Sequence, residues 1–245
     1  MPVSAQLILP IGNDEGRRFE NFMDAANSGL LPYLHSALER RISRVKSEEG
    51  KEAKGSTEYE GMVLWGEPGA GKSHLLFAAA HYLEQQGRAV ILLKPQLNVS
   101  HAAQDVEQTP VYLLDDLDAF IGNERSERDF LTMLEAVKRQ NALLIMPSRR
   151  AVKGLPISLA DLFSRLQALD SFEVHALEEP QKRELIRQRA HQKGFVLNDD
   201  VLNWLFTHMS RDLQVLLDLL EQIDSHSLSQ HRRVTIPLIK AMLSG

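Results

Sequence analysis

The sequence lacks several features that would place it in particular classes of protein. None of its 245 residues is cysteine, so disulfide bonds and cysteine-ligated zinc or iron–sulfur sites are excluded. No apolar run approaches the roughly 18 residues that cross a bilayer. Residues 1–11 also lack the basic start and the long apolar stretch of a secretion signal. These absences predict a cytoplasmic protein without a membrane segment.

Positive charge is not in excess either. The formal net charge is −5 at pH 7, and the pI is near 6.0. A protein that neutralises many phosphates by itself needs a surplus of lysine and arginine. Strong autonomous DNA binding is therefore not expected. Hydrophobic residues (43%) and charged residues (25%) have the proportions of an ordinary globular chain.

Short apolar runs alternate with helical patterns in the middle of the chain. The runs that predict strands are 62–65, 89–93, 111–114, 142–146 and 172–177. Because these runs show no polar alternation and are joined by helices, they predict a five-stranded parallel sheet with helices on both faces. After Pro180 only helical patterns follow, so the fold class is α/β with a C-terminal all-helical lid.

We expect three parts in the chain. Residues 1–13 are a flexible tail, residues 14–178 a nucleotide-binding core and residues 179–245 the lid. Within the core, residues 46–60 carry almost no large apolar side chain. Such a segment cannot bury enough surface to offset its ordering entropy, so a solvated loop is expected there.

A glycine-rich segment follows the first expected strand and precedes a helix. Its residues are Gly66, Glu67, Pro68, Gly69, Ala70, Gly71, Lys72 and Ser73. This pattern is a phosphate-binding loop, in which backbone N–H groups and a helix N-terminus face the phosphates. Lys72 then reaches the β and γ phosphates, Ser73 binds Mg²⁺, and His74 lies beside the nucleotide. The alternative is a glycine-rich turn that binds nothing.

Two adjacent acids end the third expected strand. In phosphate-loop proteins a carboxylate at this place holds Mg²⁺. Asp115 is therefore the expected magnesium residue, and Asp116 is the candidate that polarises the attacking water. The alternative is that both carboxylates cap the following turn.

Two arginines have informative positions. Arg165 lies in a short helical segment after the fourth strand, where its charge can project toward a neighbouring subunit. Arg211 follows Ser210, a good N-cap residue, so its cation is at the positive end of a helix dipole. A nearby phosphate would relieve that unfavourable placement. The alternative for either arginine is a surface ion pair.

These motifs together resemble the AAA+ module of DnaA-related proteins, which include the initiator DnaA and the Hda family of regulators. The resemblance covers nearly the whole chain, because residues 19–27 are similar to the nucleotide-base box and residues 235–240 to the end of the lid. It implies bound ADP or ATP with Mg²⁺, and it places Asn27 at the nucleotide. It also implies that Arg165 is an arginine finger and that Arg211 contacts phosphate.

The resemblance has further consequences for partners. Gln6, Leu7, Leu9 and Pro10 are similar to a peptide that docks on the β subunit of the DNA polymerase sliding clamp. It implies that the chain stimulates ATP hydrolysis by DnaA and so restrains initiation, and no DNA-binding domain is expected after the lid. Ser148 stands where the family usually has Asp or Asn, so weak hydrolysis of its own is expected.

Other functions remain open on the sequence. The main alternative is an autonomous AAA+ motor or loader that uses Lys72, Asp115 and Asp116 for its own turnover. A small-molecule kinase is a third reading, although no acceptor-substrate signature accompanies the loop. A homo-oligomer is compatible with every one of these readings.

Overall fold

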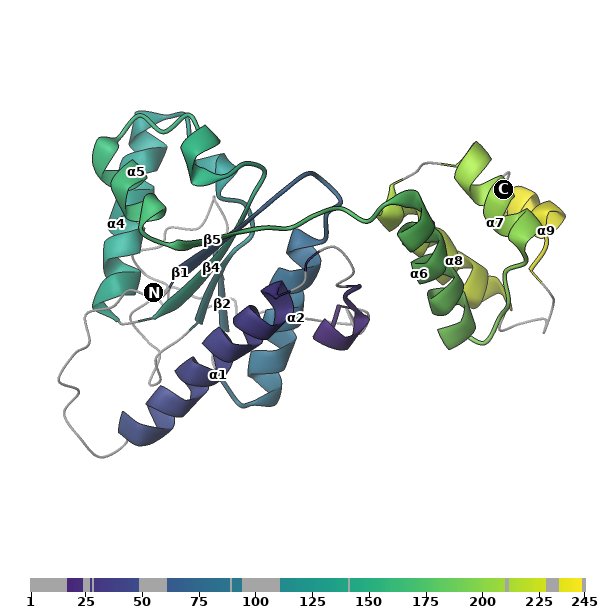
Figure 1. Ribbon diagram of the computed structural model, residues 1–245, viewed down its shortest axis with the longest axis horizontal. Helices are drawn as coiled ribbons and strands as arrows, with labels where there is room; N and C mark the ends of the chain where they lie inside the picture. The colour runs from purple at the N-terminus through teal and green to yellow at the C-terminus, as the bar shows by residue number, and fades with distance from the viewer. Residues whose placement is uncertain are drawn as a thin grey trace, which may run out of the picture. The chain divides into compact units, whose positions relative to one another are not determined.

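The computed structural model describes most of the chain, in two units. The described residues are 17–23, 27, 29–48, 61–88, 90–93, 111–140, 142–209, 212–227 and 234–243. The chain divides into residues 1–176 and residues 177–245 (Figure 1). We describe each unit by itself. The boundary expected from the sequence, after residue 178, differs from this division by two residues.

The first unit is built on a parallel sheet. Its strands are β1 (Gly61–Trp65), β2 (Val90–Leu93), β3 (Val111–Leu114), β4 (Leu143–Ser148) and β5 (Asp170–Glu173). They lie in the order β2-β3-β4-β1-β5, and each neighbouring pair is parallel. This arrangement confirms the predicted five-stranded parallel sheet.

Strand β5 does not occupy the predicted range. Residues 172–177 were expected, whereas the strand covers Asp170–Glu173. Its partner β1 ends at Trp65, and the last bond between the two segments runs from the Val174 N–H to the Trp65 carbonyl (2.7 Å). The later residues therefore have no strand to pair with. Polar residues fit the observed range because β5 is an edge strand and is largely exposed.

Helices and short 3-10 turns connect the strands. The helices are α1 (Leu30–Glu48), α2 (Lys72–Gln85), α4 (Glu124–Arg139) and α5 (Ala160–Gln167), and the 3-10 turns are η1 (Phe19–Asn21), η2 (Asp118–Phe120) and η3 (Val152–Gly154). The loop prediction for residues 46–60 is wrong at its start, because residues 46–48 are the end of α1. Residues 49–60 lie outside the described part of the chain.

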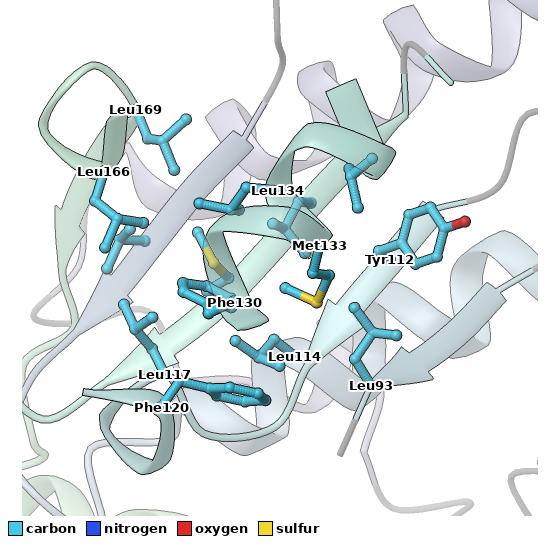
Figure 2. Packing of buried hydrophobic residues seen from close by; sticks show 14 of the residues in the cluster. Leu93, Tyr112, Leu114, Leu117, Phe120, Phe130, Met133, Leu134, Leu166 and Leu169 are labelled. Atoms are coloured by element: carbon cyan, nitrogen blue, oxygen red, sulfur yellow. The ribbon is translucent and has the colours of Figure 1, made fainter. Parts of the chain in front are cut away.

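Alternation along the strands builds an apolar layer on each face of the sheet. On β1, Val63 belongs to the cluster that contains residues of α4 and α5, whereas Met62 and Leu64 belong to the cluster that contains α1 and α2. Figure 2 shows the first cluster, in which Tyr112 and Phe130 are buried. Helices therefore cover both faces of the sheet, as a parallel sheet requires.

The second unit is helical throughout its described residues. It contains α6 (Glu179–Gln192), α7 (Asp199–His208), α8 (Leu213–Ser227) and α9 (Ile236–Leu243). Helix α6 starts at a defined place because the Gln181 side chain accepts a hydrogen bond from the Glu178 N–H (2.8 Å). Buried side chains that include Ile186, Leu205 and Leu220 form a separate core. The predicted all-helical lid is confirmed.

Among the described residues, no helix is long and apolar enough to cross a membrane.

Candidate functional site

The glycine-rich loop joins β1 to α2 in a conformation that needs its glycines. A Cβ on Gly66 would lie 2.2 Å from the backbone oxygen of Val174, so no side chain fits there. Gly71 caps α2 with a left-handed backbone (φ 95°) that side chains disfavour. Helix α2 then begins at Lys72, and its first N–H groups face the loop. The predicted loop residues thus lie between the end of a strand and a helix N-terminus.

The Lys72 ammonium group lies within this loop. Its Nζ donates hydrogen bonds to the carbonyl oxygens of Gly66 (2.6 Å) and Glu67 (2.8 Å). Burial lowers the pKa of Lys72 below the ordinary lysine value, and this outweighs the opposing attraction of Asp118 and Glu67. The amine is therefore partly desolvated, which strengthens its attraction for an anion, whereas the nearby carboxylates of Asp118 and Glu67 oppose that attraction.

The segment before α1 packs against the loop and the start of α2. The ring of Phe22 fills the space beside Gly71, where a Cβ would approach it to 2.8 Å. His74, on the first turn of α2, has its Nε2 2.9 Å from the Arg18 carbonyl oxygen, and its ring lies 5.7 Å from the Phe22 ring. The predicted base-box segment is thus next to the phosphate loop.

Asn27 binds the backbone beyond β5. Its Oδ1 accepts a hydrogen bond from the His175 N–H (2.8 Å), and its Nδ2 donates to the His175 carbonyl (3.4 Å). The residue is 5% exposed. Both polar atoms of the amide are therefore engaged with the backbone, and Asn27 fixes the path of the chain before α1.

The two predicted acids are half-buried at the end of β3. The Asp116 Oδ1 accepts a hydrogen bond from the Asp118 N–H (3.0 Å), which is the turn-capping contact that the alternative reading expected. The Asp115 side chain makes no hydrogen bond to another described residue. Both lie at the carboxyl edge of the parallel sheet, the edge from which the phosphate loop also leaves β1.

A third carboxylate at this edge was not singled out from the sequence. The Asp118 Oδ2 accepts hydrogen bonds from the Ser148 hydroxyl (3.1 Å) and the Arg149 N–H (2.8 Å). Among the charges around Lys72, Asp118 has the largest effect. The sequence could have indicated Asp118 as a site residue, because three of the four residues 115–118 are aspartate. Asp118 therefore joins the ends of β3 and β4 close to the Lys72 amine.

Arg165 lies on α5 at the surface of the first unit. Its guanidinium forms ion pairs with Glu135 of α4 and, through Nε, with Asp161 one turn earlier (3.2 Å). The hydrogen bond that Arg165 donates to Asp161 and the charge of Glu135 raise the pKa of Arg165, although desolvation opposes them. About a third of the side chain (34%) stays exposed. The surface ion pairs expected as the alternative reading are present, and the guanidinium remains accessible.

Other predicted site residues lie outside the described part of the chain. Arg211 is one of them, and so are Gln6, Leu7, Leu9 and Pro10. Within the described residues, no group of three or more His, Asp or Glu side chains is arranged to hold a metal ion. A cation there would need other ligands, such as a hydroxyl group and phosphate oxygens.

Solved structures share the fold of this chain. Domain III of the Thermotoga maritima replication initiation protein DnaA has a TM-score of 0.67 at 19% identity, with 94% of this chain and 96% of that domain covered. The AMPPCP-bound DnaA from Aquifex aeolicus has a TM-score of 0.65 at 20% identity, with 85% of this chain covered. Thermotoga maritima RuvB has a TM-score of 0.63 at 15% identity, with 93% of this chain and 71% of that chain covered. The predicted fold, a parallel sheet flanked by helices and followed by a helical unit, is confirmed.

Sequence comparison identifies the family of the helical unit. The profile described as "Hda, lid domain" matches residues 179–243. The chain therefore carries a lid domain of the Hda family and has the fold of DnaA domain III. An uncharacterised protein of Haemophilus influenzae is 31% identical to this Hda-like chain over 246 residues, covering 99% of the chain and 100% of the relative. The Hda-like chain spans 65% of the length of the Aquifex aeolicus DnaA chain.

Proposed function

We propose that this Hda-like chain restrains the initiation of DNA replication by stimulating ATP hydrolysis in the initiator DnaA. Docked on the sliding clamp, it presents Arg165 to ATP held by DnaA. The observation that carries the proposal is the partly exposed side chain of Arg165 on α5, the helix that follows β4 and the η3 turn in the chain. A guanidinium supplied in trans accelerates phosphoryl transfer by roughly 10³ to 10⁵ in related chemistry.

The chain's own loop is proposed to bind an adenine nucleotide, ADP or ATP. The loop backbone and the α2 N-terminus would receive the phosphates, and Lys72 would exchange its two carbonyl contacts for phosphate oxygens. The solved DnaA structure with bound AMPPCP supports an adenine nucleotide, because it shares this fold. Asn27, before α1, and His74, on the first turn of α2, would lie beside the nucleotide, and Arg211 would contact its phosphates.

The acids at the sheet edge suit a magnesium ion beside those phosphates. Neither the Ser73 hydroxyl nor the Asp115 carboxylate hydrogen-bonds another described residue, so their oxygens are available as ligands. Mg²⁺ bound there would neutralise phosphate charge. Asp116 is proposed to orient water, but its Oδ1 already caps the turn at Asp118. Weak hydrolysis by the chain itself is consistent with that engagement.

The N-terminal tail is proposed to bind the sliding clamp and so to localise the stimulation of DnaA. Gln6, Leu7, Leu9 and Pro10 would occupy a preformed groove of the clamp β subunit, with Gln6 as the polar anchor. A short segment of this kind gains affinity by burying a few apolar side chains. Deletion of residues 1–12 should abolish retention of the chain on clamp-loaded DNA and leave its nucleotide affinity unchanged.

Replacement of Arg165 tests the central claim. The assay measures ATP hydrolysis by DnaA on DNA loaded with clamp, in the presence of the chain. With Arg165→Ala, hydrolysis should fall to the rate of DnaA alone, and Arg128→Ala, an exposed arginine of α4, should act as wild type. Undiminished stimulation by Arg165→Ala would show that the proposed function is wrong.

An autonomous ATPase is the second candidate. It is favoured by the cluster of Lys72, Asp116 and Asp118 at one edge of the sheet. Substantial ATP turnover by the purified chain, without clamp or initiator and sensitive to Asp116→Asn, would support it over the regulatory role.

A further inference from the structure

Helix α4 carries a buried carboxylate with no place in the site described above. Glu127 is 0% exposed. Its neighbours on the helix surface, Glu124 and Arg128, form an ion pair with each other and are largely exposed. A buried carboxylate is retained only where donors replace its lost water. Its contacts therefore indicate what it holds in place.

The donors to Glu127 come from two backbone segments outside α4. Oε1 accepts from the N–H groups of Gly122 (3.0 Å) and Ser158 (3.1 Å). Oε2 accepts from the N–H groups of Ser158 (2.9 Å) and Leu159 (2.9 Å). Burial tends to raise the pKa of Glu127, but the bonds from Leu159, Ser158 and Gly122 together bring it below the ordinary value. The group is thus ionised at neutral pH and anchors the backbone at residues 158 and 159.

That backbone is the start of helix α5. Leu159 is the N-cap residue of α5, and no side chain caps the helix there. Leu162 and Leu166 bury one face of α5 in the core, which limits rotation of the helix about its axis. The Glu127 bonds fix the same helix along its axis. Arg165 follows the N-cap by six residues, so its position depends on this anchor.

Helix α4 also holds the guanidinium itself. Glu135 lies two helical turns after Glu127 on α4 and pairs with Nη1 of Arg165, while Asp161 pairs with Nε. A guanidinium has five N–H donors. With one donor each engaged at Nε and Nη1, the remaining donors include both on Nη2, and these can reach a phosphate oxygen. The two acids orient the cation without using all of its donors.

We propose that Glu127 is a positioning residue for the arginine finger: its buried carboxylate fixes the start of α5 and so places Arg165 at the surface facing a neighbouring subunit's nucleotide. This inference rests on the proposed function. A small displacement of a charged group at a reacting phosphate costs far more than the loss of one exposed ion pair. The anchor therefore contributes to the rate in trans although it contacts no substrate.

The test compares Glu127→Gln with Glu124→Gln in the assay of DnaA ATP hydrolysis on clamp-loaded DNA. Both changes remove one carboxylate charge from the first turn of α4, but only the first replaces an oxygen that accepts N–H groups at the start of α5 with an NH₂ donor. Glu127→Gln should lower the maximal stimulation about 10-fold or more. The concentration for half-maximal stimulation should not change, and neither should the chain's own ADP affinity. Glu124→Gln should stay within about twofold of wild type.

A double-mutant cycle separates positioning from general destabilisation. In a chain that already carries Arg165→Lys, Glu127→Gln should cost less than about twofold, because its effect passes through the finger. An equal loss in both backgrounds would overturn the inference, as would full activity of Glu127→Gln. If Glu127→Gln does not fold, Glu127→Asp keeps the charge but retracts the carboxylate, and it carries the same expectation. Failure of Arg165→Ala to reduce stimulation would instead remove the proposed function itself.

Discussion

The Ser148 hydroxyl at the end of β4 lies 3.1 Å from the Asp118 carboxylate, which follows the end of β3. Ser148 is 2% exposed, and its single hydroxyl proton is shared with the carbonyl of Arg150 (2.8 Å). The same carboxylate oxygen accepts the Arg149 N–H. Asp118 therefore supplies a negative charge beside Ser148, between the carboxyl ends of β3 and β4.

Replacing Asp118 by Asn should strengthen the binding of magnesium-free ADP. The change removes a negative charge near Lys72 and keeps the shape of the side chain, so repulsion of the phosphates falls. The affinity should rise about two- to fivefold, the scale of one partly solvated charge pair. Isothermal titration in EDTA measures it. Asp129→Asn, on the exposed side of α4, is the control, and equal affinities for all three chains would contradict the expectation.

The sequence predicted the parts of the site that are contiguous in the chain. The segment from β1 through the phosphate loop to α2 has a fixed spacing, because glycine geometry and the helix start are local requirements. Asp118 and Glu127 were not predicted as functional, since their partners lie about 30 positions away. The spacing of apolar residues does not indicate hydrogen bonds between residues so far apart in the chain. Contacts of this kind follow only from the order of the strands.

The strands likewise differ in how well the sequence predicts them. Four strands were predicted close to their observed places because their residues are buried, or in β2 at least half-buried, on both faces and so are mostly apolar. The predicted range of strand β5 was wrong by two residues at its start, because its polar residues 170 and 171 are exposed at the sheet edge. The apolar pattern instead pointed to residues after Glu173, where Val174 is buried without being in a strand.

ADP affinity should fall with rising pH earlier than an ordinary lysine would allow. In the nucleotide-free chain burial lowers the pKa of Lys72, whereas bound phosphates favour its charged form, so binding takes up a proton at alkaline pH. The loss of affinity should begin below the ordinary lysine value of about 10.4. Titration calorimetry in buffers of different ionisation enthalpy counts the protons.

The lowered pKa of Lys72 also determines how the free energy of unfolding of the nucleotide-free chain changes with pH: it should rise with pH in the alkaline range. A lysine whose pKa is lower in the folded chain opposes folding at neutral pH, and this penalty disappears as the pH rises through the two pKa values. Lys72→Arg is the matched control, because arginine stays charged throughout this range. If ADP binding took up as many protons in the Lys72→Arg variant as in the wild-type chain, the uptake would not come from the Lys72 amine.

Asn27→Ala should destabilise the first unit. The His175 N–H would lose its acceptor at a site where Asn27 is 5% exposed, and an unsatisfied backbone donor costs about 1 to 3 kcal/mol. Urea unfolding followed by circular dichroism measures the change. Gln167→Ala, at an exposed position of α5, should shift the free energy of unfolding by less than about 0.5 kcal/mol. A similar small shift for Asn27→Ala would mean that its amide bonds contribute nothing to stability.

Gly66→Ala should damage both stability and nucleotide binding, whereas Gly87→Ala should affect stability alone. An alanine Cβ at position 66 would lie 2.2 Å from the Val174 oxygen, and that backbone is held by the bond from the Val174 N–H to Trp65. Relieving the overlap requires a shift of the loop or of the chain after β5, at a cost of about 2 to 3 kcal/mol. The shift would also move the Gly66 carbonyl that Lys72 contacts, so ADP affinity should fall at least about tenfold.

Gly87 provides the comparison because only its backbone angle resists a side chain. Its φ is 69°, and no atom lies within 4 Å of the position where a Cβ would be. Alanine there should cost about 1 to 2 kcal/mol, the penalty of a left-handed residue, with ADP affinity unchanged. Thermal unfolding and ADP titration on both variants distinguish the two effects. If Gly66→Ala bound ADP as tightly as Gly87→Ala, close approach of Val174 would not be what requires glycine at the start of the loop.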